Sequence, residues 1–274
     1  MKMRLKDGKT KVLTLSYDDA GFQDIRLIEI MDTYGIKGTF NVNSGRFLQE
    51  DANTESDYRG LKLSEAINLY KNSPHEVAVH TLTHPSLNKL DASQIMYEIS
   101  EDQKAIESNF GKIPRGMAYP FGEYNNKVLD VLKKCHISYA RTVESTYSFE
   151  FPENWLLLHP TCHHDDEKLT ELIKKFIEDE NFYANAEMFY LWGHSFEFYK
   201  NNNWDVIENF CKFAGGHEHI WYATNIEIYN YVKAFETLQM SDDKKIIYNP
   251  SDVDIWFEID GEVYTIKSDD RVKL

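Results

Sequence analysis

Short apolar runs alternate with helical patterns along most of the chain, and this alternation restricts the fold more than any other feature. The apolar run at residues 11–17 predicts a buried strand, and residues 24–34 have the apolar spacing of a helix that Gly35 is placed to end. Strands that alternate with helices form mostly parallel sheets. Roughly seven or eight such units favour a barrel over an open sheet. We therefore expect an α/β fold built as a (β/α) barrel.

The same reasoning places the other elements of the barrel. Residues 91–111 are typical of a helix, with Asp91 in a capping-box position and Gly111 at the end. Segment 44–72 interrupts the alternation and predicts a long surface excursion that contains one helix. Further strands are expected at residues 38–42, 77–80, 116–119, 137–141, 155–158, 188–192 and 220–223, and further helices at 63–70, 169–177 and 204–213.

The last part of the chain follows a different pattern. Residues 253–259 alternate between apolar and polar side chains, and the following Asp260-Gly261 is typical of a tight type I′ turn. We expect residues 1–241 to form the catalytic barrel and residues 242–274 to form a small C-terminal β-hairpin appendage. The cross-strand pairs expected in the hairpin are Phe257 with Tyr264 and Ile255 with Ile266.

Composition and charge exclude several kinds of partner. The chain has 274 residues, with 45 acidic against 30 basic side chains and a formal net charge of -15. This negative charge repels phosphate backbones and anionic lipids, so we expect neither nucleic acid nor a membrane as partner. No stretch approaches the roughly 18 apolar residues of a membrane span. The oligomeric state stays open.

The N-terminus and the cysteines predict a cytoplasmic protein. Residues 1–9 carry charges throughout and lack the apolar core of a signal peptide. The three cysteines, Cys135, Cys162 and Cys211, are odd in number and show no C-x-x-C pairing, so we expect them to be reduced.

Polar side chains gather where the predicted parallel strands end. In a (β/α) barrel these carboxyl ends meet at one rim, where the chemistry is usually found. Two adjacent carboxylates and two histidines at a rim can supply the ligands of a Zn²⁺-like site and leave one carboxylate free for proton transfer. A spacing of H-x-x-x-H by itself also fits two solvated loop histidines. The side chains at the expected rim are Asp18, Asp19, His80, His84, Tyr119, Phe121, Arg141 and His194.

At this point the chain resembles a known family, the polysaccharide deacetylases of carbohydrate esterase family 4, or NodB-homology domain. The string LSYDDA at residues 15–20 is similar to the first family motif, T-F-D-D-G, with Tyr for Phe and Ala for Gly. HTLTH at residues 80–84 matches the H-[ST]-x-x-H motif at every fixed position. AYPFG at residues 118–122 and YLWGHS at residues 190–195 resemble the third and fifth motifs. Order and spacing agree over about residues 10–235.

The resemblance implies a distorted (β/α) barrel that binds one divalent metal ion. Its implied ligands are Asp19, His80 and His84, and the expected ion is Zn²⁺, with Co²⁺, Ni²⁺ or Mn²⁺ as alternatives. Asp18 is the implied general base and His194 the implied general acid. The backbone N–H of Phe121 is implied to bind the oxyanion, and Tyr119 and Trp192 are candidates for stacking on sugar rings.

Several alternatives stay open at this stage. Asp18 and Asp19 also fit a solvated turn, and Trp192 also fits the core. His159 competes with His194 for the role of the acid, because the string LLLHP resembles the fifth motif too. The run at residues 162–166, Cys-His-His-Asp-Asp, suggests a second metal, but its position before a helix favours a structural role.

One departure from the family pattern concerns an arginine. The third motif often carries Arg two residues before its proline, and this Arg contacts the catalytic base. Here that position is Ala118. Arg141 ends the next predicted strand at the rim, whereas Arg115 lies at the far end of its own strand. We therefore predict that Arg141 has taken over the contact with Asp18.

Together these features predict a hydrolase that acts on carbon–nitrogen bonds other than peptide bonds. The expected reaction removes acetyl groups from an N-acetylated polysaccharide or oligosaccharide. One alternative is a metal-dependent esterase or amidohydrolase for a small non-sugar amide or ester. Another is a catalytically inactive barrel that binds carbohydrate. The presence of Asp18 beside a full set of ligands favours catalysis, because a binding module needs no base.

Overall fold

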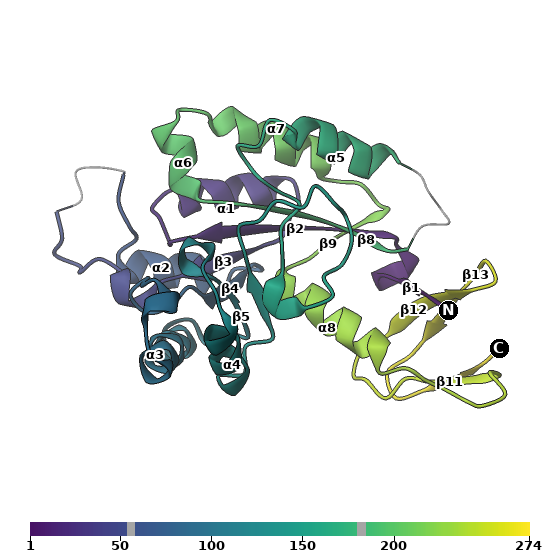
Figure 1. Ribbon diagram of the computed structural model, residues 1–274. Helices are drawn as coiled ribbons and strands as arrows, with labels where there is room; N and C mark the ends of the chain where they lie inside the picture. Colours follow the sequence, from purple (N-terminus) through teal and green to yellow (C-terminus); the bar gives the residue numbers. More distant parts are fainter. Residues whose placement is uncertain (54–57, 180–184) are drawn as a thin grey trace.

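The computed structural model describes residues 1–53, 58–179 and 185–274 (Figure 1). Its strands are β1 (Lys2–Arg4), β2 (Lys11–Asp18), β3 (Gly38–Val42), β4 (Glu76–Val79), β5 (Gly116–Ala118), β6 (Tyr139–Arg141), β7 (Cys162–His163), β8 (Glu187–Gly193), β9 (Ile220–Tyr222), β10 (Gln239–Met240), β11 (Ile246–Tyr248), β12 (Ile255–Ile259), β13 (Glu262–Ile266) and β14 (Arg271–Lys273). Its α-helices are α1 (Asp24–Thr33), α2 (Leu63–Tyr70), α3 (Ala92–Phe110), α4 (Asn126–Lys134), α5 (Leu169–Glu178), α6 (Ser195–Lys200), α7 (Trp204–Ala214) and α8 (Asn225–Glu236).

A curled parallel sheet forms the centre of the molecule. Its strands follow the order β6-β5-β4-β3-β2-β8-β7, and β9 also pairs with β2. β2 is buried along its whole length, pairs with β8 through residues 11–17, and pairs with β3 through residues 15–18. A strand enclosed in this way reads as a nearly continuous apolar run, because both faces are covered. The predicted α/β fold with a distorted (β/α) barrel is confirmed.

Helices cover the sheet and bury the apolar stripes that the sequence displays. In Figure 1, α1, α5, α6 and α7 lie together above the central strands, and α3, α4 and α8 lie below them. α3 begins after Asp91, whose side chain accepts from two backbone N–H groups, and ends at Gly111 with a φ of 67°. The predicted stripe of α5 is buried at Leu169, Leu172, Ile173, Phe176 and Ile177.

In the described ranges no helix is long and apolar enough to cross a bilayer.

The prediction of a strand at residues 155–158 is wrong. Residues Trp155–Leu157 form a single 3₁₀ turn, and the Asn154 side chain accepts from the backbone N–H of Leu156 at 3.0 Å. Four apolar residues fit a buried turn as well as a strand, and here the Asn154 cap favours the turn. The strand that pairs with β8 at this edge of the sheet is β7, which has only two residues.

The two ends of the chain build small antiparallel sheets beside the barrel. β12 and β13 form the predicted hairpin, with Phe257 opposite Tyr264 and Ile255 opposite Ile266. β1 pairs with the other edge of β12, and β10, β11 and β14 form a second sheet. Both termini lie at this end of the molecule (Figure 1). The division between residues 241 and 242 stays a prediction, and β1 belongs to the same small sheet as the hairpin.

Candidate active site

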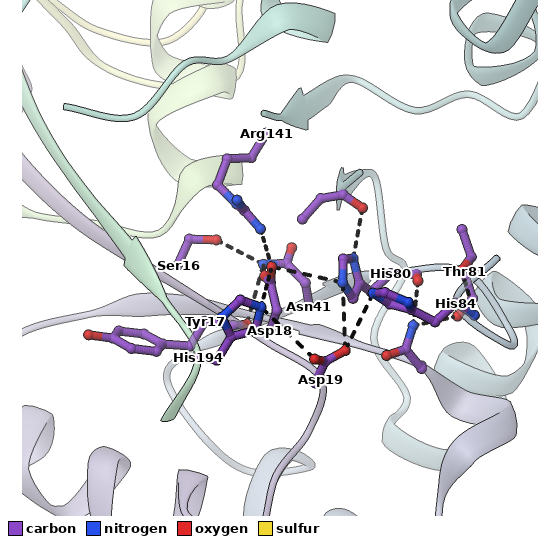
Figure 2. Close-up of polar contacts among 12 residues, drawn as sticks. Ser16, Tyr17, Asp18, Asp19, Asn41, His80, Thr81, His84, Arg141 and His194 are labelled. Carbon is purple, nitrogen blue, oxygen red and sulfur yellow. Dashed lines mark hydrogen bonds and ion pairs between the residues drawn. The ribbon is translucent and has the colours of Figure 1, made fainter. Parts of the chain in front are cut away.

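The carboxyl end of β2 separates two neighbouring aspartates. Asp18 is the last residue of the strand and is buried. Asp19 and Ala20 follow with φ angles of 77° and 49°, which residues other than glycine rarely adopt. After this turn the Asp19 carboxylate faces His80 and His84, in the loop that follows β4 (Figure 2). Such local strain is often found where a site fixes its geometry.

Asp19, His80 and His84 bring three possible metal ligands together. Asp19 Oδ1 lies 3.7 Å from Nε2 of His80 and 3.7 Å from Nε2 of His84 (Figure 2). Ligands on a tetrahedral ion with bonds of about 2.0–2.1 Å are about 3.4 Å apart, close to these distances. Asp19 Oδ1 is also buried, with no hydrogen-bond partner among the described residues. The three side chains therefore fit a divalent cation.

The backbone around the histidines prepares them for this role. His80 Nδ1 lies 2.8 Å from the carbonyl oxygen of Ala118, which can only accept. Nδ1 therefore carries the proton, and Nε2 keeps a lone pair that faces Asp19. The loop then turns through Thr81 and His84, with φ angles of 67° and 61°. Burial lowers the pKa of His84, which favours the neutral imidazole that binds metal.

Asp18 is held by two donors from other strands. The Arg141 guanidinium donates to Asp18 Oδ2, and Asn41 Nδ2 donates to Oδ1 at 2.9 Å (Figure 2). Arg141 is fully buried and lies 4.3 Å from the centre of the Trp192 ring. Burial raises the pKa of Asp18, but the charge and the hydrogen bond of Arg141 outweigh it, so the pKa falls below its usual value. The carboxylate is thus kept charged and oriented.

His194 lies between the two aspartates and a further carboxylate. Its Nε2 is 4.0 Å from Asp18 Oδ2 and 4.0 Å from Asp19 Oδ2, and its Nδ1 is 3.3 Å from Glu197 Oε2. Burial lowers the pKa of His194, but the three carboxylates outweigh it and the net pKa is raised. The rival His159 instead contacts Thr142 Oγ1 at 2.6 Å. The geometry favours His194 as the proton donor.

The remaining predicted residues occupy different environments. Phe121 has a φ of 60°, and its exposed ring lies edge-on to His84 with 4.5 Å between ring centres. Tyr119 is buried, and its hydroxyl donates to the Leu156 carbonyl oxygen at 2.8 Å. Trp192 is 9% exposed and lies under Arg141. Tyr119 and Trp192 are therefore core side chains in the structure rather than open stacking surfaces.

Beside Asp19 the surface is hollowed in a way that the sequence did not predict. The hollow has a volume of about 380 Å³. Tyr58 and Phe196 contact each other edge to face across it, with 6.0 Å between ring centres. No sequence signal identified Tyr58 or Arg46, because both lie in the irregular excursion before α2. The lining residues are Asp19, Gly21, Arg46, Leu48, Tyr58, Arg59, Gly60 and Phe196.

A comparison with known families bears directly on this rim. The family model described as polysaccharide deacetylase matches residues 5–140, about half of the chain, and includes Asp18, Asp19, His80, His84 and Phe121. The chain belongs to the polysaccharide deacetylase family. The matched segment ends before Arg141, His194 and Glu197, so the place of these three residues in the site rests on the structure.

Curated relatives of this polysaccharide deacetylase family member are similar over part of their length. Chitin deacetylase 1 of Cryptococcus neoformans var. grubii is 28% identical over 116 residues, which are 42% of this chain and 22% of that protein. A peptidoglycan-N-acetylglucosamine deacetylase of Listeria monocytogenes is 24% identical over 127 residues, 46% of this chain and 24% of that protein. The match thus spans about a quarter of the length of these relatives.

Solved structures share the fold at low sequence identity. A Mycobacterium smegmatis protein, provisionally described as a polysaccharide deacetylase, superposes with a TM-score of 0.61 over 88% of this chain and 98% of its own, at 16% identity. A family 4 carbohydrate esterase from Streptomyces lividans, solved with acetate, has a TM-score of 0.50 over 78% of this chain and 93% of its own, at 15% identity. Both likenesses support the barrel assignment.

Proposed function

We propose that the protein is a metal-dependent deacetylase that removes acetyl groups from N-acetylated sugars by hydrolysing the amide carbon–nitrogen bond. One observation carries the proposal. A buried, charged carboxylate, Asp18, is clamped by Arg141 and Asn41 beside a separate set of ligands for a divalent ion. A group that is oriented and kept charged, yet not needed as a ligand, fits a general base.

Asp19, His80 and His84 would hold the ion, with Zn²⁺ the first candidate for one carboxylate and two imidazoles. When bound, the ion supplies Lewis-acid chemistry at the acetyl carbonyl and lowers the pKa of a nearby water. Asp18 receives the proton of the water that attacks the carbonyl carbon. Arg141 keeps Asp18 charged before this transfer and fixes the direction of its carboxylate.

The same site can complete the reaction with groups of its own. The N–H of Phe121, on a backbone turned to positive φ, donates to the negative charge that develops on the acetyl oxygen. His194 then gives its proton to the leaving amine nitrogen as the carbon–nitrogen bond breaks. The Glu197 carboxylate, 3.3 Å from His194 Nδ1, stabilises the protonated imidazole before this step.

A sugar ring fits the surface next to the ligands. The aromatic rings of Tyr58 and Phe196 line the hollow beside Asp19. Aromatic side chains provide an apolar surface for the C–H face of a sugar. The names of the curated relatives, chitin deacetylase and peptidoglycan-N-acetylglucosamine deacetylase, also favour N-acetylglucosamine units as substrate. We assign the substrate to this hollow rather than to Tyr119 and Trp192.

Acetate release from a panel of N-acetyl and O-acetyl compounds tests the proposal. The panel contains oligomers of N-acetylglucosamine, simple acetamides and acetate esters. We expect release from the N-acetylated sugars, loss of release after chelation, and recovery on adding Zn²⁺, Co²⁺, Ni²⁺ or Mn²⁺. The Asp18→Asn variant, loaded with metal in the same way, serves as the matched inactive control.

Two alternatives are outcomes of the same assay. Faster release from small esters or acetamides than from any sugar would favour an esterase or amidohydrolase for a small substrate. The fold alone does not decide between catalysis and binding, because a family 4 carbohydrate esterase pseudoenzyme of Bacillus anthracis matches this chain with a TM-score of 0.50 at 16% identity. If the metal-loaded protein released acetate from none of the compounds, the inactive carbohydrate-binding barrel would replace our proposal.

A further inference from the structure

A second cluster of possible ligands lies behind His194. His163 and His164 come from β7 and the residue after it, Asp165 follows them, and Glu197 comes from the first turn of α6. One ligand atom from each of these four side chains lies within 4.8 Å of the others. Glu197 Oε2 is 3.1 Å from His163 Nε2 and 3.3 Å from His164 Nε2, and Asp165 Oδ1 is 3.6 Å from His164 Nε2.

His164 is the central observation, because it is buried without a hydrogen bond. Its side chain is 0% exposed, and in the part of the chain that the structure describes neither ring nitrogen has a hydrogen-bond partner. Phe198 stacks on its ring at 4.1 Å, and Tyr17 lies 5.8 Å away on a nearly parallel plane. A Cβ on Gly193 would lie 1.9 Å from His164 Nδ1, so only glycine leaves room for this ring. The packing thus directs Nε2 at the two carboxylates.

Asp165 is oriented by two neighbours rather than used as a helix cap. Asn201 Nδ2 donates to Asp165 Oδ2 and Asn203 Nδ2 donates to Oδ1, both at 3.2 Å. The structural role expected before α5 falls to Asp166, which accepts from the Lys168 N–H at 2.9 Å. Donors that hold a carboxylate in place are typical of the surroundings of metal ligands.

The geometry points to a second divalent-cation site formed by His163, His164, Asp165 and Glu197. The distances of 3.1, 3.3 and 3.6 Å between their ligand atoms lie close to the edge of about 3.4 Å of a tetrahedron with bonds of about 2.0–2.1 Å. Two imidazoles and two carboxylates favour Zn²⁺ or Co²⁺ over Mg²⁺ or Ca²⁺. Binding through His163 Nε2 places the proton on Nδ1, which gives up the 3.2 Å bond from the Asp165 N–H.

This site goes beyond the proposed function and does not depend on it. The two ligand sets share no residue, and the His194 ring lies between them, with Nε2 toward Asp19 and Nδ1 toward Glu197. An ion bound to Glu197 would fix the carboxylate that faces His194. The cation behind His194 would therefore position a residue of the first site without contact with substrate.

Counting bound metal tests the inference without an activity assay. The full chain is stripped with chelator, loaded with Co²⁺, passed through a desalting column and measured by atomic emission, and the visible Co²⁺ spectrum is recorded. The second cluster is removed by the double variant His163→Ala/Asp165→Asn, because these side chains are partly exposed and their loss leaves the packed His164 in place. The first set is removed by Asp19→Asn/His84→Ala. His217→Ala, at a surface histidine outside both clusters, is the control.

We expect about two ions per chain in the wild type and in His217→Ala, and about one in each double variant. The visible Co²⁺ bands should weaken in His163→Ala/Asp165→Asn, and the bands that remain should be those of the ion at Asp19, His80 and His84. A wild-type count of none, or a count of one that persists in His163→Ala/Asp165→Asn, would overturn the inference. So would an unchanged count and spectrum in His163→Ala/Asp165→Asn. If only Asp19→Asn/His84→Ala left the count unchanged, the metal role in the proposed function would fail while the second site stood.

Discussion

At the scale of single residues, the site consists of groups that the sequence could identify and groups that it could not. Asp18, Asp19, His80 and His84 belong to motifs at strand ends, so their position at one rim follows from the fold class. Glu197 gave no such signal. It stands three residues after His194 at the start of a helix, where an acidic residue is expected for reasons of capping alone.

The two neighbouring aspartates should separate by phenotype. Asp18→Asn keeps the three ligand atoms, so we expect it to bind metal like the wild type but to lose roughly 10² or more in turnover, the scale of general-base catalysis. Asp19→Asn removes a charged ligand and should lower metal affinity first. Metal content and acetate release, measured on the same preparations, check both expectations. Full activity in both variants would place the site elsewhere.

Arg141 should act on the pH dependence of the reaction. The Arg141 charge holds the pKa of Asp18 below its usual value, so its removal lets burial raise that pKa. A base with a higher pKa stays protonated to a higher pH. In Arg141→Gln we therefore expect a lower kcat and an acidic limb of kcat/KM that moves to higher pH, with partial recovery in Arg141→Lys.

The matched control for this prediction is Arg115→Gln. Arg115 lies just before β5, and among the contacts described its guanidinium donates only to the carbonyl oxygen of the neighbouring Pro114. Its pH profile should equal that of the wild type. Because Arg141 is buried, circular dichroism must confirm that its variants are folded. A folded Arg141→Gln protein with an unshifted acidic limb would remove Arg141 from the positioning of Asp18.

At the scale of elements, the sequence predicts those that carry a local signal. Helix α3 begins and ends where Asp91 and Gly111 indicate, because caps and left-handed residues act on the adjacent turn. Strands β2 and β3 are rich in β-branched and aromatic residues and are equally clear. The two-residue strand β7 and the turn at Trp155–Leu157 are too short for periodicity, and only their neighbours in space decide their form.

The carboxyl group of Glu76 links elements and should make stability depend on pH. It accepts from Thr39 Oγ1, Tyr139 Oη and the Ile226 N–H, which joins β3, β4, β6 and α8. Burial raises the pKa of Glu76 from 4.5 to about 7. The folded state then holds the proton more tightly than the unfolded chain, so this group's contribution is fully present below pH 4.5 and is lost as pH rises through about 7.

We expect Glu76→Gln to remove part of this pH dependence. The amide oxygen can still accept from Thr39 and Ile226, and the amide N–H₂ can donate to the Tyr139 hydroxyl. Chemical unfolding at pH 5 and pH 7.5 should show a smaller fall in the free energy of unfolding than in the wild type, by on the order of 1–3 kcal/mol. Glu236→Gln, at an exposed acid on the same helix α8, is the control. An equal fall in all three proteins would contradict the assignment.

At the scale of the whole molecule, the two ends of the chain meet far from the rim. The hairpin of β12 and β13 could be predicted because its pairs are close in sequence. The pairing of β1 with β12 could not, since Met3 and Phe257 are opposite each other but lie at opposite ends of the chain. The buried Arg4 guanidinium donates to the Glu258 carboxylate across the same pair of strands. Such long-range contacts leave no local pattern in a single sequence.

This arrangement predicts that the terminal sheets affect stability rather than chemistry. Phe257 is fully buried and stacks on Tyr264 with 5.5 Å between ring centres, in a cluster that includes Leu5 and Tyr231. Phe257→Ala removes a large side chain and leaves a cavity, so we expect a loss of about 3–5 kcal/mol in the free energy of unfolding. The exposed Val263→Ala in the neighbouring strand should change it by less than about 1 kcal/mol.

The same two variants should bind metal and release acetate like the wild type at temperatures where they are folded, because neither position contributes a side chain to the rim. Thermal unfolding and metal content, measured on one preparation of each variant, separate the two effects. A Phe257→Ala protein that is folded by circular dichroism but has lost metal would mean that the terminal sheets support the site directly. In that case the proposed division between a catalytic barrel and an appendage would be wrong, since the core around Phe257 would then be part of what holds the rim in place.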